Sequence, residues 1–77
     1  MTFEQLLDML TDMHPDIDFE TAEGLIERKV LTSFDVVSIV AELSETYGVD
    51  VGAVDIVPEN FNSAQALFAL IQRLEEE

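Results

Sequence analysis

The sequence contains no cysteine, and this absence excludes disulfide bonds and thiolate chemistry. Small secreted domains commonly depend on disulfides, so their absence favours the cytoplasm. The stretch "MTFEQLLDML" carries Glu4 and Asp8, whereas a signal peptide has a basic start followed by an unbroken apolar run. No apolar segment approaches the ~20 residues that a membrane-spanning helix needs. We therefore expect a cytoplasmic protein that does not insert into membranes.

Basic residues are also scarce: 3 Lys and Arg stand against 17 Asp and Glu, and the formal net charge is −14 at pH 7. Nucleic acids and anionic lipids are bound through Lys and Arg, so we expect neither as a partner. A charge of this size favours a soluble monomer, because copies of the chain repel one another. It also attracts partners that have basic surfaces.

Groups able to support catalysis are few as well. His14 is the only histidine, and its place just after a predicted helix is favourable for structural reasons alone. The 3 basic residues are too few to form an oxyanion clamp or a phosphate cradle. We expect no catalytic residues in this chain, and we do not expect it to be an enzyme.

Hydrophobic residues are plentiful, at 48% of the chain, and they predict a single domain over residues 1–77 with one core. Apolar residues recur with helical spacing in the segments Phe3–Met13, Phe34–Tyr47 and Ala64–Leu74. Before the last segment, Asn62 and Gln65 have the spacing of a capping box. At its end, residues 75–77 are all Glu, and we expect them to fray at the negative end of the helix dipole.

Two connections separate these predicted helices. The first, residues 14–32, is long, and its stretch "ETAEGLIE" predicts a helical turn. The second contains "VDVGAVDIVPENF", where Gly52 and Pro58 favour a short extended piece and one helical turn near Gly52–Ile56. The sequence therefore predicts an all-α fold with a long loop between the first two helices.

The second predicted helix has more apolar residues than one buried stripe requires. At 100° per residue, a core stripe is formed by Val36, Ile39, Val40, Leu43 and Tyr47. A second group lies away from that stripe or at its edge and comprises Phe34, Asp35, Val37, Ala41, Glu42 and Glu45. Apolar patches bordered by charge often mark interaction sites, so we predict that this group contacts partner proteins.

Ser33 lies at the start of the same helix, where two interpretations apply. In the first, Thr32 or Ser33 simply caps the helix, and Thr32 forms a capping box with Asp35. In the second, Ser33 is a functional hydroxyl beside the apolar patch. Ser63 is a useful comparison, because it also begins a helix but no exposed apolar patch follows it.

A calcium loop is a third, separate possibility. Asp16, Asp18, Glu20 and Glu27 occupy positions 1, 3, 5 and 12 of an EF-hand pattern. The pattern fails at position 6, where the sharp turn needs Gly and the sequence has Thr21. Chance spacings of this kind are common in acidic chains, and we expect no metal site.

The whole layout resembles the acyl and peptidyl carrier protein family. The resemblance rests on "TSFDVVSIVAEL" and "YGVDVGAVDIVPENFNSAQALFALI", and it covers the chain from Phe3 to Leu74. The stretches "PDIDF" and "PENFNSAQAL" are most like the D-alanyl carrier protein and related small stand-alone carriers. The resemblance implies a four-helix acyl-carrier-like bundle, with three main helices and a short third helix.

It also implies a function. Ser33 matches the serine that receives a 4′-phosphopantetheine arm from coenzyme A, and the arm carries an acyl or aminoacyl group as a thioester. Phe34 matches the hydrophobic residue after that serine, and Asp35 the acid that follows. The implied partners are a phosphopantetheinyl transferase, an acyl- or amino-acid-activating ligase and a downstream acyltransferase. Thr32 stands where the family usually has Asp. The alternative is an acidic helical interaction module in which Ser33 is only a helix cap.

Overall fold

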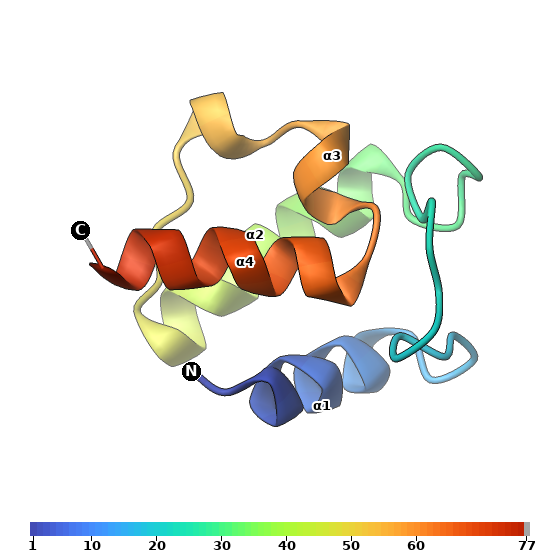
Figure 1. Cartoon of the computed structure of the whole chain (residues 1–77), viewed down its shortest axis with the longest axis horizontal. Helices are drawn as coiled ribbons and strands as arrows, with labels where there is room; N and C mark the ends of the chain where they lie inside the picture. Colours follow the sequence, from blue (N-terminus) through green and yellow to red (C-terminus); the bar gives the residue numbers. More distant parts are fainter. Residues whose placement is uncertain (77) are drawn as a thin grey trace.

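A computed structural model of the chain describes residues 1–76, which are helical with no β-strand among them. Its elements are α1 (Phe3–Met13), α2 (Ser33–Tyr47), the 3₁₀ turn η1 (Ala53–Asp55), α3 (Pro58–Phe61) and α4 (Ala64–Glu76). In the view of Figure 1, α4 crosses in front of α2, α1 lies below both, and the two termini lie toward the same end. The all-α fold class and the three long helices are thus confirmed, and η1 is the turn predicted near Gly52–Ile56.

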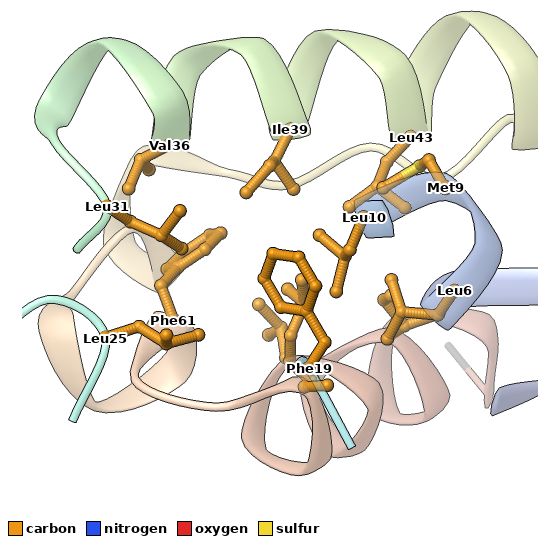
Figure 2. Packing of buried hydrophobic residues seen from close by; sticks show 14 of the residues in the cluster. Leu6, Met9, Leu10, Phe19, Leu25, Leu31, Val36, Ile39, Leu43 and Phe61 are labelled. Atoms are coloured by element: carbon orange, nitrogen blue, oxygen red, sulfur yellow. The ribbon is translucent and has the colours of Figure 1, made fainter. Parts of the chain in front are cut away.

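The core is shared by the long helices and the loop between α1 and α2. Figure 2 shows Leu6 and Leu10 of α1, and Ile39 and Leu43 of α2, gathered around Phe19 of that loop. Phe19 is only 2% exposed, although it lies in a segment without regular structure. Burial of side chains such as this one holds the long loop against the helices, since each buried large apolar side chain contributes about 1.5–3 kcal/mol.

Two contacts join α1 to α4 at the end of the molecule that carries both termini. The rings of Phe3 and Phe68 pack edge to face with centroids 5.4 Å apart. The N-terminal amine of Met1 lies 2.8 Å from a carboxylate oxygen of Glu75. This amine supplies a positive charge close to the negative end of the α4 dipole. Fraying was predicted for residues 75–77, but Glu75 and Glu76 lie within α4; Glu77 lies outside the described residues.

The capping box predicted before α4 is also wrong. The side chain of Ser63, not that of Asn62, accepts a hydrogen bond from a backbone N–H of the first turn, that of Ala66 at 3.0 Å. Asn62 and Gln65 instead bond to the loop between α1 and α2, and Gln65 Nε2 donates to the carbonyl of Glu20 at 2.9 Å. Pro58–Phe61 forms a short third helix, as the carrier resemblance implied, although the local pattern placed a helical turn only near Gly52–Ile56; Pro lies in its first turn.

The loop that precedes α2 contains two separate α-type turns. One closes between Ala22 N–H and the carbonyl of Asp18, and the other between Arg28 N–H and the carbonyl of Gly24. A helical turn was predicted within "ETAEGLIE", and the structure has two such turns in this part of the loop instead of one. Lys29 ends the second turn with φ of 60°, a left-handed conformation that non-glycine residues seldom adopt. The loop thus enters α2 from an ordered turn.

Candidate functional site

The cap of α2 is Thr32, and this leaves Ser33 free. The Thr32 hydroxyl accepts a hydrogen bond from Asp35 N–H at 3.3 Å, and the Asp35 carboxylate accepts one from Thr32 N–H at 2.9 Å. Together these bonds form the predicted capping box. Ser33 is the first residue of the helix, its side chain is exposed, and its hydroxyl makes no hydrogen bond within residues 1–76. A free hydroxyl is therefore held at a well-defined point of the backbone.

Ser63 shows the opposite arrangement at the start of α4. Its hydroxyl oxygen is used as the cap of that helix, and its side chain is half-buried. Two further serines lie within α2: Ser38 is half-buried, and Ser44 donates to Asp50 at 3.1 Å. Among these serines, only Ser33 is exposed and also has a hydroxyl that no other residue of the described chain engages.

Asp35 is a structural residue more than a free docking charge. Besides the capping bond to Thr32 N–H, it accepts a bond from the Thr32 hydroxyl at 3.0 Å and faces His14 Nε2 at 2.9 Å. These contacts leave its side chain 18% exposed. The hydrogen bond from Thr32 N–H is the main cause that lowers the pKa of Asp35, and burial acts against it; the Thr32 hydroxyl and His14 lower the pKa further. Asp35 thus ties the end of α1 to the start of α2, a role that differs from the docking role predicted for it.

The other predicted docking residues lie where the helical pattern places them. Phe34 is 78% exposed, Val37 is 64% exposed, and Ala41 is exposed on the same side of α2. Glu45 follows one turn further on, is exposed and makes no hydrogen bond within the described residues. Glu42 is half-buried and accepts a hydrogen bond from Thr46 at 2.7 Å. The face of α2 that begins at Ser33 is therefore apolar first and acidic further along.

Ser33 also borders a groove of about 230 Å³. Its lining comes from the start of α2, from the preceding loop and from the segment between η1 and α3: Ile26, Thr32, Ser33, Val36, Val37, Ile56, Val57, Pro58 and Phe61. No charged side chain lines it. The sequence analysis missed this groove, although the apolar run "VDIVP" was a signal, because that region was assigned only to a short extended piece and a helical turn. Its walls come from residues 26–37 and from residues 56–61, which are well separated in the sequence.

The acidic residues that match the EF-hand spacing have other contacts in the structure. Within residues 1–76, no group of three or more acidic or histidine side chains is arranged to hold a metal ion. Asp18 instead bonds to Glu20 N–H and to the Thr21 hydroxyl within its own turn. Glu27 lies near Asn62, at 3.5 Å from its side-chain nitrogen. Asp18 and Glu27 therefore each have a contact within the chain.

Compared with protein-family models, curated proteins and solved structures, the chain matches none of them. Within residues 1–76, no helix is both long and apolar enough to cross a membrane. Function is therefore inferred from the chemistry of Ser33 and of the surfaces beside it.

Proposed function

We propose that this chain is a carrier protein of the acyl and peptidyl carrier type, with 4′-phosphopantetheine attached to Ser33. The observation that carries the proposal is that two neighbouring residues at the start of α2 have different roles. Thr32 caps the helix, and Ser33 keeps an exposed hydroxyl with no partner in the described chain. A serine needed only as a cap has its oxygen occupied, as Ser63 does. The helical arrangement is then acyl-carrier-like, and the protein works in the cytoplasm.

Attachment requires a phosphoryl-group transfer that this chain does not catalyse alone. The Ser33 oxygen forms a bond to the phosphorus that bears the pantetheine arm, and the pyrophosphate bond of coenzyme A breaks, releasing adenosine 3′,5′-bisphosphate. The proton of the hydroxyl passes to a base of the phosphopantetheinyl transferase. The terminal thiol of the arm then supplies the site for a thioester with an acyl or aminoacyl group.

The groove beside Ser33 supports this proposal. It begins at the attachment residue, and its walls are formed by apolar side chains such as Val36, Ile56 and Phe61. An arm attached to Ser33 would begin beside those walls, which would shelter apolar surface from water. The groove is partly open to solvent, so it suits a group that is held for a time and then released.

The exposed face of α2 also supports the carrier proposal, because it offers a surface for partner proteins. Phe34, Val37 and Ala41 offer apolar contact, and Glu42 and Glu45 continue the surface with negative charge. Combined with the net charge of −14, this face favours basic partner surfaces and rapid, weak association. The partners we propose are the transferase, an acyl- or amino-acid-activating ligase and a downstream acyltransferase, each meeting the monomeric carrier in turn.

One alternative remains, because the same exposed face suits an acidic helical interaction module that binds a single partner. In this alternative Ser33 is only a helix cap, but the residue that caps α2 is Thr32. The module interpretation therefore leaves the exposed hydroxyl of Ser33 without a use, whereas the carrier interpretation requires it.

Intact mass spectrometry after incubation with coenzyme A and a phosphopantetheinyl transferase tests the proposal. We expect a gain of one phosphopantetheine by the wild-type chain and none by Ser33→Ala. Ser63→Ala is the matched control and should be modified like the wild type. Modification of Ser33→Ala would show that the site is misassigned. A wild-type chain that none of several transferases modifies would reject the carrier proposal in favour of the interaction module.

A further inference from the structure

Asn62 clamps the loop that leads into Ser33. It lies at the junction of α3 and α4, and its side-chain oxygen accepts hydrogen bonds from two successive backbone N–H groups, those of Ile26 at 3.0 Å and Glu27 at 3.3 Å. Its backbone carbonyl accepts a third, from Leu25 N–H at 2.8 Å. Its side-chain nitrogen lies 3.5 Å from a carboxylate oxygen of Glu27. One residue therefore holds three consecutive loop residues.

A short chain of hydrogen bonds connects this clamp to the modification site. The carbonyl of Leu25 accepts bonds from Val30 N–H at 2.9 Å and from Leu31 N–H at 3.0 Å. Leu31 is buried and directly precedes Thr32, the cap residue before Ser33. Fixing Leu25 against Asn62 therefore also fixes the last residues of the loop before α2 begins.

The clamp also involves two residues of the groove lining. Ile26, whose N–H is bonded to Asn62, and Phe61, the residue before Asn62, both line the groove. Without the two bonds to the Asn62 side chain, residues 25–27 keep a single hydrogen bond to Asn62, from Leu25 N–H to its carbonyl. The approach to Ser33 and the wall of its groove thus depend on the same side chain.

We propose that Asn62 is a positioning residue for Ser33, which sets the loop of residues 25–31 in the conformation that a phosphopantetheinyl transferase recognises. This proposal rests on the carrier function proposed above. Because the loop continues directly into Thr32 and Ser33, an enzyme that binds Ser33 also covers it. A loop that is docked for only a fraction of the time weakens apparent binding by that fraction and leaves the chemical step unchanged.

The test compares Asn62→Ala with two matched variants. In Asn62→Ala, amide hydrogen exchange at Ile26 and Glu27 should accelerate about tenfold or more, since two hydrogen bonds lose their acceptor. The KM for modification should rise about fivefold, which corresponds to a loop docked about a fifth of the time, while kcat stays unchanged. Asn62→Asp combined with Glu27→Gln keeps the acceptor oxygen without opposing carboxylates and should restore both values. Gln65→Ala removes the side-chain hydrogen bond from α4 to Glu20, which lies earlier in the connection between α1 and α2. This variant should leave KM unchanged.

The outcomes separate this proposal from the carrier function. Unchanged exchange at Ile26 and Glu27 in Asn62→Ala would overturn the clamp. The positioning role would be overturned by any of three results: faster exchange with an unchanged KM, a change in kcat alone, or failure of the restoring variant. If the wild-type chain is never modified, the carrier function is overturned and the positioning role with it. A low melting temperature of Asn62→Ala does not obscure the result, because the restoring variant and the ratio of KM to kcat distinguish positioning from general destabilisation.

Discussion

Two single variants, Thr32→Ala and Ser33→Ala, distinguish the residue that caps α2 from the residue whose hydroxyl is free. In Thr32→Ala, Asp35 N–H loses its acceptor and the Asp35 carboxylate loses the donor hydroxyl 3.0 Å away. Loss of a Thr or Ser cap costs about 0.5–2 kcal/mol, typically about 1. For a domain of 77 residues, 1 kcal/mol corresponds to a fall in Tm of about 4–8 °C.

Ser33→Ala should have no such effect. The Ser33 hydroxyl makes no hydrogen bond within residues 1–76, and its side chain is exposed, so its removal breaks no contact there. Ala also has a higher helix propensity than Ser, by a few tenths of a kcal/mol. We therefore expect the Tm of Ser33→Ala to equal that of the wild type or to exceed it slightly.

Circular dichroism at 222 nm, followed during heating and during urea titration, measures both variants on the unmodified chain. Ser63→Ala is a positive control, because it removes the cap of α4 and should cost about as much as Thr32→Ala. A Ser33→Ala variant destabilised as strongly as Thr32→Ala would refute the assignment of the cap. It would also remove the main observation in favour of modification at Ser33.

Three further predictions concern charge and burial. The pKa of Asp35 is lowered in the folded state, so its contribution to stability is present above the usual value of 3.8 and is lost as pH falls through the folded-state pKa. The Tm difference between the wild type and Asp35→Asn should accordingly shrink as pH is lowered from 6 to 2.5, and a constant difference would contradict this. Added sodium chloride should raise the Tm, because the net charge of −14 is self-repulsive and the screening length falls to ~8 Å at 0.15 M salt; a Tm that falls from low salt onwards would be inconsistent with it. Val37→Asp should change the free energy of unfolding by no more than ~0.5 kcal/mol, because Val37 is exposed. Val36→Asp places an unpaired charge at a position that is only 8% exposed, and this variant should unfold. If the two variants melt at the same temperature, the orientation of α2 is wrong.

The sequence was sufficient to locate the long helices and the exposed face of α2. Helical periodicity is a local property, and it placed Phe34 and Val37 outside the core correctly. Gly48, directly after Tyr47, ends α2 with φ of 67°, the left-handed conformation that glycine tolerates best. The capping box of Thr32 and Asp35 was recognised too, since its two residues are only three positions apart.

Competition for a side chain could not be resolved from the sequence. Asn62 has the right spacing for a capping box, but the loop 35 or more residues earlier takes its side chain, and Ser63 caps α4 in its place. Asp35 has the pattern of a surface acid on α2, but His14, 21 residues away, lies against it. In both cases the local pattern allows two partners, and the packing of distant segments selects one.

By itself, the sequence determined the helices, the acidic charge and the presence of a serine at the start of α2, because each follows from residues that are close together in the chain. The tertiary structure decided which hydroxyl is free, which acid is engaged and where an apolar groove lies. Those features depend on burial and on hydrogen bonds between the loop, α2 and the segment from η1 to α4. Such contacts form only when the core around Phe19 brings these segments together, and no local pattern specifies them.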